Sequence, residues 1–196
     1  MKKFILLLVL ISTLSSCAVF SFTTGSGVTE PSKESSVSII ENRMRRMGLS
    51  SKWKNFNSNK ISKFKVSDIN KFFNTVNSFK GVQYRYGGTN RSGIDCSGLV
   101  YRGLKSVGYT GKRLNAEFVA KLGTLIANKE SLVKGDLVCF SINKNSKNLI
   151  NHIAVYNGSG GFIHAPSSGK TVRTGDINDV YYWADKFIFG VRFTNN

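Results

Sequence analysis

The stretch Gly93-Ile94-Asp95-Cys96-Ser97-Gly98-Leu99-Val100 places a cysteine where a helix is expected to begin. Asp95 is a natural N-cap residue. The apolar residues that follow recur at helical spacing as far as Gly108: Leu99, Val100, Leu104 and Val107. Cys96 would then lie in the first turn, where unpaired backbone N–H groups and the helix dipole favour a thiolate. The stretch therefore predicts a nucleophilic cysteine at a helix N-terminus.

The two histidines of the chain, His152 and His164, both lie downstream of this cysteine. Each lies in a strand-like apolar run, and Asn157-Gly158-Ser159-Gly160 between them predicts a hairpin. If the hairpin is symmetric about Gly158, the two histidines lie directly opposite each other on one face of the sheet. A bulge in the glycine-rich loop would shift that register. A thiol beside an imidazole that a further polar group orients is the minimum set for a cysteine nucleophile.

These residues have alternative interpretations. Cys96, His152 and His164, with Cys139 or Asp95, could be zinc ligands, but no closely spaced pair such as Cys-x-x-Cys is present. Each histidine could also be a structural residue. We favour the catalytic interpretation because the cysteine and both histidines occur together, and we expect neither a metal nor a cofactor. Cys139, in an apolar run, is expected to be a small buried hydrophobic residue.

Residues 1–16 are expected to be a lipoprotein signal peptide. Met1-Lys2-Lys3 is a basic start, and the apolar run 4–11 is too short to span a bilayer as a mature helix. Leu14-Ser15-Ser16-Cys17 resembles the bacterial lipobox, in which the cysteine becomes lipidated. We therefore expect an exported protein, anchored to the membrane through lipidated Cys17. In a cell with two membranes, Ala18 after the cysteine indicates the outer membrane, facing the periplasm. Ordinary secretion with an incidental cysteine is the alternative.

The remaining chain divides into three expected parts. Residues 17–36 are rich in Ser, Thr and Gly and are expected to be a flexible tether. Residues 37–66 are a basic N-terminal extension, with a short helix expected at 37–47 and a loop at 48–65. Residues 67–196 are expected to be the main folded domain.

The chain carries a formal net charge of +17. A strongly basic surface suits an anionic partner such as a cell-wall polymer, a lipid headgroup or a nucleic acid. The expected export makes nucleic acid the least suitable of these, and we expect no nucleic-acid partner. A solvated basic face without a dedicated ligand is an equally good interpretation.

The order of the expected elements indicates the fold class. Helices are expected from Ser67, as N-cap, to about residue 80, at 96–107 and at 114–127. The third would turn these residues inward: Phe118, Val119, Leu122 and Leu125. Strands are expected at 136–141, 152–156, 161–164 and 186–193. Helices followed by antiparallel strands are typical of an α+β fold rather than of alternating βαβ units.

Five motifs in this order resemble the NlpC family of cell-wall cysteine peptidases. They are Gly81-Val82-Gln83-Tyr84-Arg85-Tyr86-Gly87-Gly88-Thr89, the stretch 93–100, Gly135-Asp136-Leu137-Val138, Asn151-His152-Ile153-Ala154-Val155-Tyr156 and Phe162-Ile163-His164-Ala165. The resemblance runs from about Ile69 to the C-terminus. It implies a papain-like α+β fold, in which N-terminal helices, one with the nucleophile at its N-terminus, pack on an antiparallel β-sheet.

The resemblance also implies a role for each motif residue. Cys96 would be the nucleophile, His152 its general base and later the acid, and His164 the residue that orients His152. Tyr84 would polarise or position the scissile carbonyl, and the backbone N–H of Cys96 would stabilise the oxyanion. Asp95 and Ser97 would shape the site. The alternatives are that Tyr84 is a core aromatic, that Tyr86 takes its role, and that Asp95 is a plain N-cap.

The implied function is a peptidoglycan stem-peptide endopeptidase that works through a thioester acyl-enzyme. The bond cut would be the γ-D-glutamyl–diamino acid bond or the D,D cross-link between stems. One alternative is an amidase or acyltransferase on the same scaffold. The other is a non-catalytic, basic wall-binding lipoprotein, against which the complete Cys–His–His set argues.

Overall fold

The computed structural model describes residues 35–57, 64–167 and 170–195. The expected signal peptide and most of the expected tether, with Cys17, lie outside the described residues. The helices are α1 (Ser36–Arg46), α2 (Ser50–Asn57), α3 (Ile69–Asn77), α4 (Cys96–Ser106) and α5 (Ala116–Val119), and a 3-10 turn, η1, spans Lys129–Ser131. None of the helices among these residues is long and apolar enough to cross a membrane.

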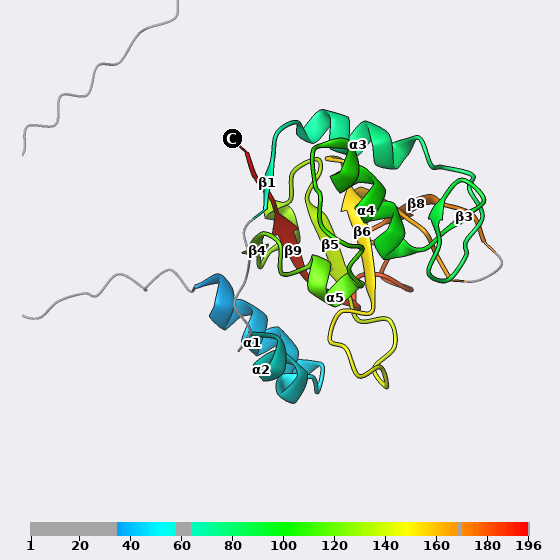
Figure 1. Cartoon of the computed structure of the whole chain (residues 1–196). Coiled ribbons are helices and arrows are strands. Elements are labelled where there is room, and N and C mark those ends of the chain that lie inside the picture. Colours follow the sequence, from blue (N-terminus) through cyan, green and yellow to red (C-terminus); the bar gives the residue numbers. More distant parts are fainter. Residues whose placement is uncertain (1–34, 58–63, 168–169, 196) are drawn as a thin grey trace, which may run out of the picture. The chain divides into compact units, whose positions relative to one another are not determined.

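Six antiparallel strands form the main sheet in the order β4-β9-β5-β6-β7-β8 (Figure 1). Their bounds are β4 (Thr124–Ile126), β5 (Leu137–Phe140), β6 (His152–Tyr156), β7 (Gly161–His164), β8 (Arg173–Asp176) and β9 (Phe187–Arg192). Two short pairs complete the fold: β1 (Lys65–Val66) with β10 (Thr194–Asn195), and β2 (Thr89–Asn90) with β3 (Gly93–Ile94). This arrangement confirms the expected α+β class. The four expected strands are present, whereas β4 and β8 were not expected.

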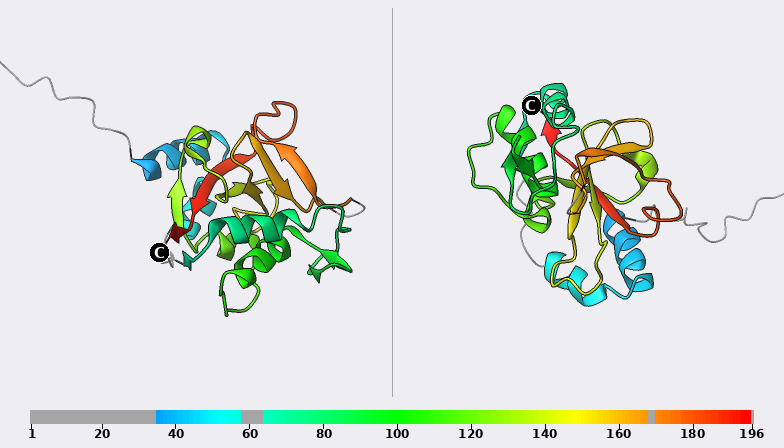
Figure 2. Two further views of the ribbon diagram at one scale, coloured as in Figure 1. Left: turned by 90° about the horizontal axis from the view of Figure 1, so that it is seen from above. Right: turned by 90° about the vertical axis from the view of Figure 1, so that its right-hand side faces the viewer.

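The main sheet is buried on both faces. Along β5, Leu137 and Cys139 belong to a core shared with α1, α2, α3 and α4, whereas Val138 and Phe140 belong to a second core around Trp183. Figures 1 and 2 show α3 and α4 side by side against one face of the sheet, and α4 contacts β6 directly. Cys139 is thus a buried apolar residue, as predicted.

The basic segment before residue 67 forms part of the first core. The helix expected at 37–47 is confirmed as α1, but the loop expected at 48–65 is wrong, because α2 lies within it. Trp53 and Phe56 of α2 pack against Phe189 of β9, with ring centroids 6.1 and 5.4 Å apart. A helix this short is marginal alone, so the burial of its two aromatic side chains stabilises it. The polar residues of this segment occupy its exposed positions, so its overall composition does not reveal the buried aromatic side chains.

The third expected helix is mostly wrong. Only α5 is helical within 114–127, and β4 follows it. In β4, Leu125 pairs with Val191 of β9. A Cβ at Gly123 would clash with the backbone oxygen of Arg192, so glycine permits the close approach with which this pairing begins. Phe118, expected to face inward, is 55% exposed.

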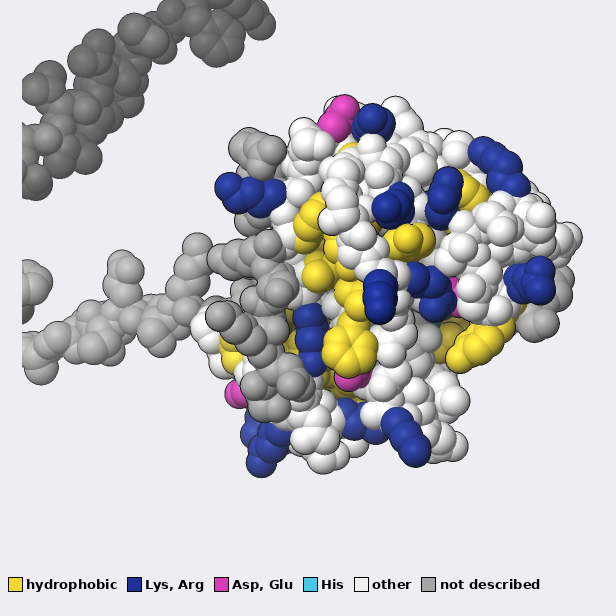
Figure 3. All heavy atoms as spheres, viewed as in Figure 1, with side chains coloured by type: hydrophobic (Ala, Val, Ile, Leu, Met, Phe, Trp, Pro, Cys, Tyr) yellow, Lys and Arg dark blue, Asp and Glu magenta, His cyan; other side chains and the backbone are white. Residues whose placement is uncertain are grey.

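Basic side chains are distributed over the face of the molecule that Figure 3 shows. In Figure 3, Lys and Arg side chains are spread over the face shown in Figure 1, at separate positions rather than in one patch. That distribution is typical of a solvated basic face.

Candidate functional site

Cys96 is the first residue of α4, as the sequence predicts. The Asp95 side chain caps the helix, and its Oδ1 accepts a hydrogen bond of 2.7 Å from the backbone N–H of Gly98. Cys96 is partly exposed and lines a cleft of about 320 Å³. Tyr84 and Arg113 line the same cleft, so the thiol opens into a space large enough for part of a peptide.

The surroundings of Cys96 favour the thiol over the thiolate in the resting protein. Burial, followed by the negative charge of Asp95, raises the pKa of Cys96 to about 11. The backbone N–H groups of Ile153 and Ser97, and then the charge of Arg113, lower this pKa but do not outweigh burial. The helix terminus does support the anion, as the sequence suggested, but burial is the larger effect.

Arg113 links the residues on either side of the cysteine. Its Nη2 donates to Oδ2 of Asp95 at 2.5 Å and to Oγ of Ser97 at 2.9 Å. Asp95 Oδ2 also accepts from the backbone N–H of Gly87, at 2.8 Å. Asp95 is therefore more than an N-cap: it joins α4, the Gly87 turn and Arg113. Sequence reasoning missed Arg113, which lies 18 residues from Asp95 in an irregular segment with no recognisable signal.

His152 and His164 are hydrogen-bonded to each other, with 3.0 Å between Nε2 of His152 and Nδ1 of His164. The expected register is wrong, because Val155 pairs with Ile163 and Tyr156 with Phe162, so that the turn is centred on Ser159. The cause is the three-residue turn, in which Gly158 and Gly160 both have positive φ. The shift is two residues, which keeps both histidines on one face as diagonal neighbours.

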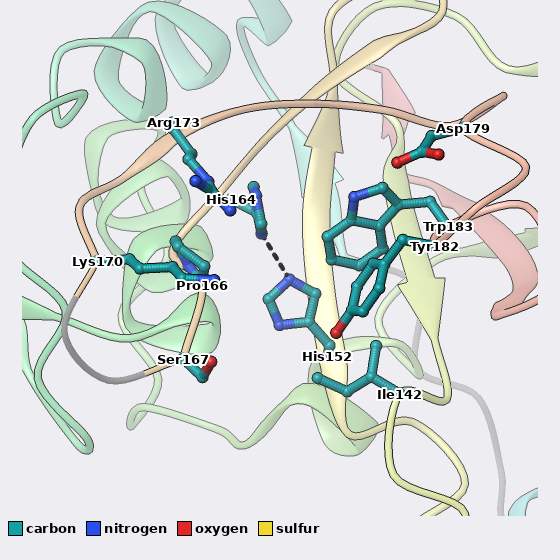
Figure 4. A pocket seen from close by; sticks show the side chains of 10 residues that line it. All are labelled: Ile142, His152, His164, Pro166, Ser167, Lys170, Arg173, Asp179, Tyr182 and Trp183. Carbon is teal, nitrogen blue, oxygen red and sulfur yellow. Dashed lines mark hydrogen bonds between the residues drawn. The ribbon is translucent and has the colours of Figure 1, made fainter.

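The imidazole pair is enclosed by aromatic side chains. Trp183 stacks on His152 at 5.5 Å between ring centroids and meets His164 edge-on at 5.1 Å (Figure 4). Burial lowers the pKa of His152 to about 4. Burial, then the charges of His152, Arg173 and Lys170, lowers the pKa of His164 to about 3. Both rings are therefore neutral at neutral pH. Sequence reasoning missed Trp183, which lies in a loop and belongs to no recognisable motif.

The helix with the cysteine meets the strand with the histidine at the beginning of β6. The N–H of Ile153, which favours the Cys96 thiolate, belongs to the residue after His152. In the described ranges no hydrogen bond joins the Cys96 thiol to either imidazole. Those ranges also contain no group of three His, Cys, Asp or Glu side chains that could hold a metal ion, including the zinc ligands considered above.

Tyr84 and Tyr86 differ in burial. Both line the cleft with Cys96, but Tyr86 is 90% exposed, whereas Tyr84 packs partly buried against the first core. Burial, then the proximity of Cys96, raises the pKa of Tyr84, so its hydroxyl keeps its proton. Tyr84 is thus the better-fixed hydroxyl donor of the two.

Ser146, Asn148 and Ile150 of the loop 142–150 also line the cleft, and this loop is held from two distant elements. Lys52 of α2 donates through Nζ to the backbone oxygens of Lys144 and Ser146, at 2.6 and 2.7 Å. Glu117 of α5 accepts from the N–H of Leu149 at 2.5 Å. Sequence reasoning missed both contacts, which join residues 32 to 94 positions apart.

The fold and motifs of this chain match known proteins. Residues 81–192 match the model of the NlpC/P60 family. The chain is 35% identical over 112 residues to the probable endopeptidase NlpC of Escherichia coli, covering 57% of this chain and 70% of that one. It is 35% identical over 109 residues to a gamma-D-glutamyl-L-lysine dipeptidyl-peptidase of Bacillus cereus, covering 56% of this chain but only 32% of that one.

A solved structure has the same fold. The crystal structure of an NlpC/P60 family protein from Bacillus cereus aligns with a TM-score of 0.56 and 30% sequence identity, over 65% of this chain and 41% of the other. The matched region includes Cys96, both histidines and Tyr84. Because the family match extends over more than half of the sequence, the chain belongs to the NlpC/P60 family of papain-like cell-wall peptidases.

Proposed function

We propose that this protein is a cysteine endopeptidase that cleaves an amide bond in the peptide stems of peptidoglycan. The observation that carries the proposal is the position of Cys96, at the N-terminus of α4 and beside the strand that begins with the hydrogen-bonded His152. The family and the activities for which its relatives are named support this substrate class.

In this proposal the resting pair is a neutral thiol and a neutral imidazole. Nε2 of His152 carries the ring proton and donates a hydrogen bond to Nδ1 of His164, which leaves Nδ1 of His152 free to accept the thiol proton. The thiol-to-imidazole hydrogen bond forms as substrate binds, because catalytic hydrogen bonds are often long in its absence. Formation of thiolate is thereby coupled to attack, and His164 stabilises the imidazolium that results.

The covalent steps follow from these positions. The sulfur of Cys96 forms a bond to the scissile carbonyl carbon, and the thiol proton moves to His152. The C–N bond then breaks, and His152 gives that proton to the leaving amine. Water attacks the thioester with His152 as base, releases the acid and restores the thiol.

Three further groups support the carbonyl. The N–H of Cys96, in the first helical turn, has no acceptor within the helix and is an oxyanion donor. Tyr84 keeps its phenolic proton and donates to the carbonyl or to a neighbouring substrate group. Asp95 and Ser97 act through Arg113, which holds both and so fixes the first turn of α4.

The test uses purified muropeptides, monomeric and cross-linked, incubated with the protein and with Cys96→Ala, and analysed by mass spectrometry. We expect cleavage that Cys96→Ala abolishes. Loss of cross-linked dimer alone assigns D,D-endopeptidase activity, and cleavage of monomers after D-Glu assigns γ-D-glutamyl specificity. Products with a new acyl acceptor in place of water would instead assign an acyltransferase. Absence of any Cys96-dependent product would overturn the proposal.

We also propose that a lipid on Cys17 anchors the protein in the outer membrane, with the catalytic region in the periplasm. The support is the lipobox-like Leu14-Ser15-Ser16-Cys17 and the Ala18 that follows. We expect radiolabelled palmitate to be incorporated by the protein but not by Cys17→Ala, and only the unsubstituted protein to sediment with outer membranes. Equal labelling and sedimentation of both would contradict the anchor.

A further inference from the structure

A second pocket, of about 310 Å³, adjoins the imidazole pair and is separate from the cleft of Cys96. Figure 4 shows the imidazoles between two walls. One wall carries Pro166, Lys170 and Arg173, and the other carries Asp179, Tyr182 and Trp183. Because His152 lines this pocket and Asn151 lines the cleft, the two hollows meet at consecutive residues of the chain.

The first wall holds two cations whose charge is not neutralised nearby. Arg173 is the direct β-pair partner of His164 across β7 and β8, so the strand register places it at the imidazole pair. Lys170 lies at the same wall, and its backbone oxygen accepts a 2.7 Å hydrogen bond from the N–H of Tyr84, which lines the cleft. Within 35–57, 64–167 and 170–195, neither side chain has an ion pair or a hydrogen bond.

The positive charge of this wall reaches the imidazoles, since Arg173 and Lys170 both contribute to the low pKa of His164. The opposite wall adds one carboxylate, Asp179, of which Oδ1 already accepts the N–H of Tyr181 at 3.0 Å. An occupant with a carboxylate toward Lys170 and Arg173, and an amino group toward Asp179, would complement both walls.

The proposed mechanism identifies which part of the substrate enters this pocket. The acyl part is bonded to Cys96 and stays in the cleft with Tyr84 and Arg113. The leaving amine takes its proton from Nδ1 of His152, and His152 also lines the second pocket, so the residue that carries this amine extends from the cleft along the imidazole into that pocket. In a peptidoglycan stem, whichever of the two bonds is cut, that residue is the diamino acid.

We propose that this pocket binds the free carboxylate of a dicarboxylic diamino acid on the leaving side of the scissile bond, through Arg173 and Lys170. The inference rests on the proposed function and specifies its substrate: stems with diaminopimelate are preferred over stems with lysine, whose side chain has no carboxylate. Since both cations are exposed, we expect each to contribute roughly five- to tenfold to kcat/KM.

The test compares three synthetic stems that differ only at the diamino acid: meso-diaminopimelate, its amidated form and L-lysine, each as a monomer and as a cross-linked pair. Cleavage is measured with the full-length protein, Arg173→Gln, Lys170→Gln and a matched control, Arg102→Gln, on the exposed face of α4. We expect the unsubstituted protein to prefer the diaminopimelate stem. In Arg173→Gln and in Lys170→Gln the ratio of kcat/KM on the diaminopimelate stem to kcat/KM on the lysine stem should fall roughly five- to tenfold, mainly through a higher KM for the diaminopimelate stem, and Arg102→Gln should keep that ratio.

The outcomes separate the two proposals. Equal cleavage of all three stems, or a preference that survives both substitutions, overturns the carboxylate site while the endopeptidase function stands. Equal loss on all stems in Arg173→Gln and Lys170→Gln also overturns it, because the two residues would then support the fold or the imidazoles instead. Cleavage of none of the stems by the unsubstituted protein overturns both proposals.

Discussion

His152 and His164 are diagonal neighbours on one face of β6 and β7, and a 3.0 Å hydrogen bond joins Nε2 of the first to Nδ1 of the second. This bond fixes the tautomer of His152 if the nitrogen of His164 accepts. The contribution of this hydrogen bond to catalysis then requires an acceptor at the position of Nδ1 of His164, and that acceptor need not be an imidazole.

His164→Leu, which cannot accept, should lower kcat on the order of a hundredfold with little change in KM. His164→Gln, whose amide oxygen can accept, should recover a large part of that loss. Steady-state kinetics on one muropeptide measures both. Equal loss in the two variants would show that His164 acts through packing rather than through the hydrogen bond.

Arg113 should stabilise the fold as well as the site. Arg113→Met would leave the carboxylate of Asp95, whose side chain is 6% exposed, without its cation. We expect the free energy of unfolding to fall by about 2–3 kcal/mol, because the uncompensated charge remains buried. Urea denaturation measures this, with Arg102→Met, on the exposed face of α4, as the control that should change it by less than about 0.5 kcal/mol. Equal midpoints for Arg113→Met and the unsubstituted protein would contradict this role of the ion pair.

Lys52 should order the cleft wall from outside the region matched to the family. Lys52→Met removes the two hydrogen bonds to the backbone oxygens of Lys144 and Ser146. Backbone amides in 142–150 should then exchange hydrogen roughly tenfold faster, and KM should rise while kcat changes little. Lys54→Met, an exposed substitution on the same helix, is the control. Unchanged exchange in 142–150 would show that α2 does not hold the loop.

The pH dependence of alkylation reports the protonation state of the resting pair. With the pKa of Cys96 raised to about 11 and that of His152 lowered to about 4, thiol and imidazole are both neutral between these values. The rate of Cys96 alkylation by iodoacetamide, followed by peptide mapping, should therefore rise about tenfold per pH unit from pH 6 to 9. A plateau across this range would indicate a preformed thiolate–imidazolium pair and would contradict the neutral resting state.

The parts of the fold that could be predicted from sequence are those fixed by local chemistry. Asp95 caps α4 and places Cys96 in its first turn, because capping needs only neighbouring residues. The pairing of His152 with His164 was predicted with the wrong register, since the register depends on backbone angles at Gly158 and Gly160 that composition does not reveal. Because the register shifts by two residues, both histidines stay on the same face of the sheet and remain in contact.

The wrong predictions concern segments whose secondary structure depends on tertiary contacts. The polar stretch that contains α2 becomes helical because Trp53 and Phe56 reach Phe189, and the segment after α5 becomes a strand because β9 is available to pair with it. The roles of Arg113 and Lys52 could not be predicted from the sequence for the same reason. Their partners are distant in sequence, and nothing about an isolated basic residue indicates which carboxylate or carbonyl it will meet.

The central claim is that Cys96 forms a thioester with the acyl part of a stem peptide. The most direct measurement is rapid acid quenching of the protein during turnover of a muropeptide, followed by intact mass spectrometry and peptide mapping. We expect an adduct whose mass equals the acyl portion, located on Cys96 and absent from Cys96→Ala. Turnover that proceeds with Cys96 unmodified at every quench time, or that persists in Cys96→Ala, would contradict it.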